Sequence, residues 1–88
     1  MQKYKLLTAT NNATGRLAIG TSGRLVGKIV ESSAVTDIQI GRGLTIWNTD
    51  ETGDGIHTSK VIDISRDGST HQVTITTLNT TYVLEETA

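Results

Sequence analysis

The stretch HQVTITTL, residues 71–78, decides the fold class of this 88-residue chain, because apolar and polar residues nearly alternate along it. Alternation of this kind is typical of a β-strand with one buried and one solvated face. Threonine is the commonest residue of the chain, and proline and phenylalanine are absent. β-Branched residues fit a pleated surface and lose side-chain freedom in a helix. The sequence therefore predicts a small all-β domain.

The stretch also belongs to a predicted hairpin, in which residues 60–65 and 70–78 flank the turn pair Asp67-Gly68. This pair is typical of a type I′ turn, and centring the turn on it pairs Ile62 with Val73 and Ile64 with His71. The register gathers four apolar residues on one face: Ile62, Ile64, Val73 and Ile75. A second reversal at Asn79-Thr80 pairs Thr77 with Tyr82 and Ile75 with Leu84, so we expect a three-strand antiparallel meander ending at Glu85.

The N-terminal half predicts shorter strands, over residues 4–8, 16–20, 25–31, 37–40 and 44–47. Inward-facing pairs are expected at Leu17 and Ile19, Ile38 and Ile40, and Leu44 and Ile46. Gly27 indicates a bulge or bend in its strand, and one helical turn is expected near residues 32–36. About six to eight short strands at this spacing favour a small barrel or compact sandwich, folded as one domain over residues 1–88.

Composition narrows the classes of function. The formal net charge is −1, which makes nucleic acid an unlikely partner, and cysteine is absent, which excludes disulfides and thiol chemistry. The first residues, MQKYK, lead into no long apolar run, so we expect no signal peptide, no membrane contact and a cytoplasmic location. With three aromatic residues in a short chain, we expect a homo-oligomer that buries further surface.

A Gly-Arg step recurs three times, and it places Arg16, Arg24 and Arg42 directly after glycines. Glycine lets backbone N–H groups approach a ligand, and the arginine fork suits phosphate or carboxylate. Thr21 and Ser22 could add hydroxyl donors, so these five residues form a candidate anion or nucleotide site. The alternative is structural: each glycine starts a turn and each arginine begins a solvated strand.

Trp47 and His57 complete the set of candidate ligand-binding residues. Alternation from Leu44 and Ile46 directs Trp47 away from the core, where an indole can stack on a ring or anchor a partner. His57 stands before hydroxyl residues, but no Gly-x-Ser-x-Gly elbow accompanies it. We therefore predict a protein that is not an enzyme, with no catalytic residue.

The polar loop at residues 48–55 imitates the first half of a calcium loop. The bidentate acid required at its twelfth position would be Ser59, which cannot supply a carboxylate. We therefore expect no metal ligands and no cofactor.

The C-terminal segment, residues 57–85, reads HTSKV, then a short hairpin, then TLNTTYVLE. It resembles the tail of short uncharacterised bacterial and phage proteins with the pattern Thr-Ser-x-Val followed by Thr-x-Asn-Thr-x-Tyr-x-Leu. The resemblance implies a small β-rich fold, often an SH3-like barrel, and, for a phage-encoded protein, the host cytoplasm. It carries no active-site residue over to this chain.

These observations favour a non-enzymatic binding module that holds or sequesters an anionic, nucleotide-like small molecule or inhibits a protein partner. The alternative is a structural or assembly subunit, of a phage virion or an oligomeric scaffold, that has no small-molecule ligand and pairs through its strand edges.

Overall fold

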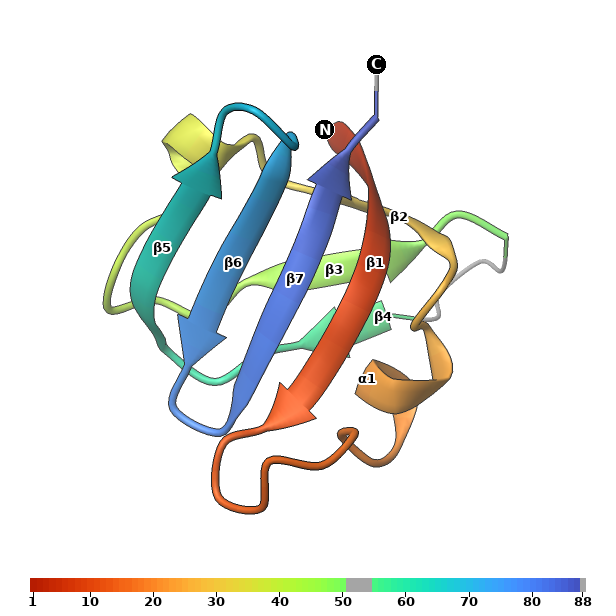
Figure 1. The fold of residues 1–88 in the computed structure, drawn as a ribbon, viewed down its shortest axis with the longest axis vertical. Coiled ribbons are helices and arrows are strands. Elements are labelled where there is room, and N and C mark those ends of the chain that lie inside the picture. Colours follow the sequence, from red (N-terminus) through yellow and green to blue (C-terminus); the bar gives the residue numbers. More distant parts are fainter. Residues whose placement is uncertain (51–54, 88) are drawn as a thin grey trace.

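The computed structural model describes residues 1–50 and 55–87, which fold into seven strands and almost no helix (Figure 1). The strands are β1 (Gln2–Asn11), β2 (Ile29–Ser32), β3 (Thr45–Asn48), β4 (Gly55–His57), β5 (Val61–Asp67), β6 (Gln72–Thr77) and β7 (Thr80–Glu86). A four-residue helix, α1 (Thr21–Arg24), and a single 3-10 turn, η1 (Val35–Asp37), interrupt the N-terminal half. The prediction of an all-β fold is confirmed.

All seven strands belong to one antiparallel sheet with the order β4-β3-β2-β1-β7-β6-β5. The sheet curls, so that β3 and β4 cross behind the layer formed by β5, β6, β7 and β1 (Figure 1). No strand pairing among the described residues joins β4 to β5, and the barrel is therefore not closed. The connection before β3 partly bridges this gap, because Gly41 N–H donates to Val61 O (2.7 Å) and Val61 N–H donates to Arg42 O (2.9 Å).

The core lies inside the curl and is almost entirely aliphatic, with Tyr4 and Tyr82 as its aromatic members. Alternate residues of each strand point inward, as the period of a β-strand requires. Tyr4, Leu6, Leu25, Val30, Ile46, Val61, Val73, Ile75 and Leu84 have no exposed surface. These residues come from every strand except β4 and from the turn after α1, so burial of apolar surface ties the two layers together.

The C-terminal meander is confirmed as β5, β6 and β7, but both predicted registers were wrong. Ile64 pairs with Ile75 rather than with His71, and Ile75 pairs with Tyr82 rather than with Leu84. The shifts are four and two residues, both even, and an even shift alone does not move a side chain to the other face of the sheet. Val73 and Ile75 are therefore buried as expected.

The turn chemistry explains the first shift. β5 continues to Asp67, and the reversal uses residues 68–71 rather than Asp67-Gly68. The Asp67 carboxylate accepts hydrogen bonds from the Ser69 N–H (2.9 Å) and the Ser69 hydroxyl (2.8 Å), and His71 adopts a positive φ of 57°. A bulge between Val61 and Asp63 also turns Ile62 outward, where it is 50% exposed instead of buried.

The N-terminal half departs further from the sequence prediction. No regular strand forms over residues 16–20, where Leu17 and Ile19 are exposed and only an isolated bridge joins Leu17 to Thr10. Residues 37–40 form no strand either, and Ile40 is exposed although Ile38 is buried. The predicted inward pair Leu44 and Ile46 is confirmed. The expected helical turn lies at η1, and Gly27 marks the bend before β2 with a φ of +88°.

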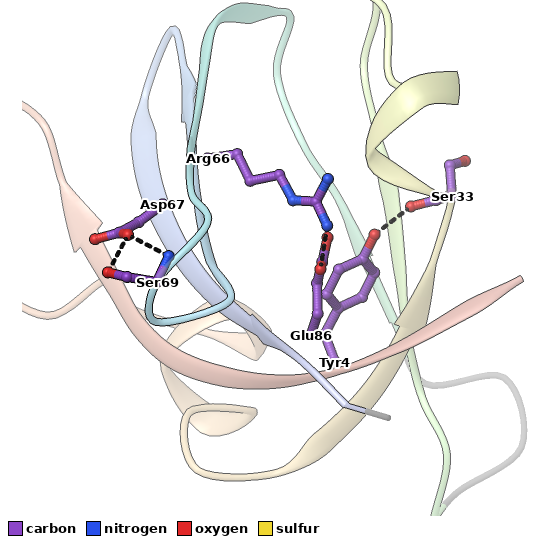
Figure 2. A network of polar contacts seen from close by, with 6 residues as sticks. All are labelled: Tyr4, Ser33, Arg66, Asp67, Ser69 and Glu86. Atoms are coloured by element: carbon purple, nitrogen blue, oxygen red, sulfur yellow. Dashed lines mark hydrogen bonds and ion pairs between the residues drawn. The ribbon is translucent and has the colours of Figure 1, made fainter.

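One open end of the curl carries a polar cluster around the buried ring of Tyr4 (Figure 2). The Tyr4 hydroxyl donates to Ser33 O (2.8 Å), and beside it Arg66 pairs with Glu86 (2.8 Å). Burial raises the pKa of Tyr4, the Glu86 carboxylate raises that pKa further, and Arg66 partly lowers it. Away from this ring, the hydrogen bonds from Ser69 lower the pKa of Asp67.

The raised pKa of Tyr4 predicts an alkaline loss of stability. The folded state holds the phenol proton more tightly than the unfolded chain does, so the free energy of unfolding falls as pH rises above 10.0, the ordinary value. Urea unfolding at pH 8 and at pH 10.5 to 11 measures this fall. Tyr4→Phe is less stable than wild type at pH 8 because Ser33 O loses its donor. Its free energy of unfolding nevertheless falls less than that of the wild type when the pH is raised. Tyr82→Phe, which also loses a hydroxyl but keeps Tyr4, retains the wild-type fall; an identical fall in Tyr4→Phe would contradict the assignment.

Candidate functional site

Trp47 and His57 form an aromatic pair on the outer face of the sheet. Their ring centroids are 5.9 Å apart with an interplanar angle of 82°, an edge-to-face arrangement. Trp47 is 36% exposed and lies across from Gly55 in the β3–β4 pair. A Cβ at position 55 would lie 2.9 Å from Cε3 of Trp47, so the indole rests against the glycine. The predicted outward direction of Trp47 is thus confirmed.

The neighbours of this pair are polar and partly charged. Thr45 lies across from His57, and its hydroxyl shares a hydrogen bond with Nδ1 of the imidazole (3.3 Å). On the other side, Glu31 of β2 lies across from Trp47, and Lys3 of β1 lies across from Glu31. Residues directly opposite in a sheet share a face, with Cβ atoms about 5 Å apart. The outer face therefore presents an aromatic centre with hydroxyl, carboxylate and ammonium groups around it.

The first two Gly-Arg steps meet at one corner of the molecule. A Cβ at Gly23 would overlap the Ala18 carbonyl oxygen and lie 3.6 Å from Cγ of Leu17, so α1 packs directly against the segment that follows Arg16. Arg16 is exposed, and the exposed Arg24 at the end of α1 donates to the Thr21 hydroxyl (3.4 Å). We name Arg16, Thr21 and Arg24 the α1 corner.

Ser22 has a different environment from the other members of its candidate set. Its hydroxyl is hydrogen-bonded to the hydroxyl of Tyr82 (3.0 Å), which is 2% exposed. Ser22 therefore ties α1 to the core, and it satisfies the only polar atom of the Tyr82 ring.

Contacts join α1 to both β1 and β4. β4 carries Gly55 and His57, the two residues against which the Trp47 ring lies. Figure 1 shows α1 close to β4, at the side of the molecule where the chain leaves β3. The fold thus brings the α1 corner next to the strand that supports the aromatic pair, although α1 and Trp47 are more than twenty residues apart in sequence.

Arg42 is not part of this arrangement. Its carbonyl oxygen bonds to Val61 at the start of β5, and β5 is separated from β1 by β6 and β7. At a strand spacing of about 4.8 Å, that separation is about 14 Å along the sheet. In Figure 1 the connection through residues 38–43 lies beside β5, whereas α1 lies at the opposite side. The structure packs α1, which ends at Arg24, against the residues that follow Arg16, and it leaves Arg42 elsewhere.

Half of the calcium-loop pattern at residues 48–55 lies outside the described residues, because 51–54 are not among them. Within residues 1–50 and 55–87, no group of three histidine or acidic side chains is placed to hold a metal ion. None of the helices in this same part of the chain has the length and apolar character needed to span a membrane.

Glu31 and Lys3 were not predicted as neighbours of Trp47. Each alternates with buried residues in its own strand, but only the pairing of β2 with β3 places Glu31 beside the indole, and only the pairing of β1 with β2 places Lys3 on the far side of Glu31. Local sequence patterns contain no signal for that pairing.

Comparison of the chain with protein-family models, with curated proteins and with solved structures finds no match.

Proposed function

We propose that this protein is a non-enzymatic binding module for an anionic ligand that carries a flat ring, such as a nucleotide. The observation that carries the proposal is the position of α1 against β4. It sets an arginine-bearing corner beside a strand whose outer face supports an exposed aromatic pair.

The aromatic pair suits the ring of such a ligand, and the α1 corner suits its phosphate. A base or similar ring stacks on Trp47, whose indole is held by Gly55 and by the edge of His57. Stacking of a base on an aromatic side chain contributes about 1–3 kcal/mol. The phosphate is recognised by Arg16 and Arg24, because a guanidinium can donate two parallel hydrogen bonds to phosphate oxygens.

Binding rather than catalysis is favoured by the surroundings of the one histidine on this surface. His57 shares a hydrogen bond with a threonine hydroxyl, and no carboxylate of the described residues is hydrogen-bonded to it. A general base needs a partner that orients it and a reacting group within hydrogen-bond reach. The T-shaped contact instead uses the imidazole to hold the Trp47 ring.

Titration with AMP, adenosine and pyrophosphate tests the proposal. Trp47 is the only tryptophan, so its fluorescence reports directly on this surface. We expect AMP to quench the emission, and we expect adenosine, which has no phosphate, and pyrophosphate, which has no ring, to bind more weakly. By calorimetry, Trp47→Leu and Arg24→Gln each weaken AMP binding about ten-fold or more.

Arg42→Gln is the matched control, since it removes the same charge at the other side of the sheet. We expect its affinity for AMP to equal that of wild type. Loss of binding in Arg42→Gln with none in Arg24→Gln would contradict the site, and no AMP binding by the wild type would contradict the nucleotide ligand.

An assembly subunit is the second candidate, and the open edge of β5 favours it. Beyond Val61, that edge forms no backbone hydrogen bond within the described part of the chain. Unpaired strand edges are sites at which another chain can add a strand. Solution mass measurements with and without AMP separate the two: concentration-dependent assembly without AMP binding supports the subunit.

A further inference from the structure

The free edge of β5 is a second surface, at the opposite end of the sheet order from the Trp47 surface. β5 spans Val61–Asp67, and of these only Val61 uses its outer edge, in the two hydrogen bonds with Gly41 and Arg42. All residues after Val61 are exposed except Ile64, which is half-buried. Six successive residues of an edge strand are therefore open to another strand.

Apolar side chains gather at the beginning of this edge. Ile40, Ile62 and Leu78 are 59%, 50% and 57% exposed. Ile62 belongs to β5, and Ile40 precedes Gly41, which donates to Val61 O on the outer edge, whereas Leu78 donates to Lys60 O from the β6 side. The free edge therefore begins beside two exposed aliphatic side chains, Ile40 and Ile62, that a partner can cover.

The charge on the outer face of β5 identifies the kind of partner. Asp63, Ser65 and Asp67 lie across from Thr76, Thr74 and Gln72, so these three residues share one face. Both carboxylates are exposed, and their partners across the strand pair are neutral. The Asp63 carboxylate makes no hydrogen bond or ion pair with another described residue. This face of the strand therefore carries two negative charges that no cation on β6 balances.

We propose that β5 accepts, by strand addition, an extended segment of another protein in which basic residues alternate with apolar ones. The added strand continues the sheet through backbone hydrogen bonds. Its basic side chains lie opposite Asp63 and Asp67 on the outer face, and its apolar side chains lie on the other face, beside the half-buried Ile64. Opposite charges across a strand pair stabilise it, and like charges destabilise it.

The same charges make a second copy of this chain a poorer occupant of the edge than a basic strand. Two copies that pair antiparallel through β5 bring four carboxylates, two Asp63 and two Asp67, onto one continuous face. Acidic residues at an edge are a device by which proteins prevent such self-pairing. The acidic residues do not prevent a strand with basic side chains from pairing with this edge.

The test uses two capped synthetic peptides, KVKVKVK and EVEVEVE, and amide NMR spectra of the full chain. We expect the basic peptide to shift the amide signals of residues 61–67, and the acidic peptide to have little effect. Asp63→Lys weakens binding of the basic peptide at least about three-fold and strengthens binding of the acidic one. Asp50→Lys changes the net charge equally at the far end of β3, and is expected to change neither affinity.

Three results would overturn the proposal: no change at residues 61–67 with either peptide, equal binding of both peptides, or self-association of the peptide-free protein through these amides. Trp47→Leu serves as a further control, because it disrupts the nucleotide surface and is expected to bind the basic peptide as the wild type does. Failure of the AMP experiment and failure of this one are therefore distinguishable.

Discussion

Leu84→Ala is expected to lower the free energy of unfolding by about 2–5 kcal/mol. Leu84 has no exposed surface, and in the middle of the front layer it lies across from Leu6 of β1 and Val73 of β6. Truncation removes buried methyl groups and leaves a cavity, and the three paired strands around it are too constrained to move in and fill it. Small domains have only about 5–15 kcal/mol of total stability, so the variant loses a large share of it.

Leu78→Ala is the matched control for Leu84→Ala, because the same side chain is truncated at a position that is 57% exposed. We expect its free energy of unfolding to remain within about 0.5 kcal/mol of wild type. Urea unfolding followed by circular dichroism measures both variants. Equal losses in the two would contradict the assignment of Leu84 to the core.

Gly23→Ala is expected to destabilise the protein by about 1–3 kcal/mol or more and to weaken AMP binding at the same time. An added Cβ would overlap the carbonyl oxygen of Ala18, whose own N–H donates to Ala9 O of β1 (2.8 Å). Since the backbone on both sides is tied down, α1 must move away from the segment after Arg16. That displacement separates the two arginines of the α1 corner.

Gly68→Ala provides the comparison for Gly23→Ala. Nothing lies within 4 Å of a Cβ at position 68, and its φ is outside the left-handed region. We expect its melting temperature and AMP affinity to equal those of wild type. A Gly23→Ala protein as stable as Gly68→Ala would show that α1 does not pack against Ala18.

The sequence predicted the β class, the meander and most of the buried faces, because these follow from a period of two residues along the strand. The β5–β6 register was wrong because Asp67 bonds to Ser69 at the end of β5, so that the chain reverses over residues 68–71 instead of at Asp67-Gly68. The bulge at Ile62 was also missed. Both depend on hydrogen bonds that no pattern in residues 60–78 specifies.

In the N-terminal half, isolated apolar residues misled the prediction. Leu17 and Ile19 alternate as a strand would, yet the residues around them form a turn and α1, and Leu25, directly after α1, supplies the buried side chain. For the candidate site, the outward direction of Trp47 followed from local alternation. The grouping of Arg16 with Arg24, without Arg42, depends on long-range pairing and could not follow from the repeated Gly-Arg step.

The most direct test of the account is an amide and indole NMR spectrum of the wild-type protein titrated with AMP. If AMP binds at the α1 corner and the aromatic pair, the chemical-shift changes are confined to three regions. These are α1 with the neighbouring Arg16, Thr45–Asn48 with the Trp47 indole N–H, and Gly55–His57. Changes centred instead on residues 41–43 and 61–67, or no change at the Trp47 indole at saturating AMP, would contradict it.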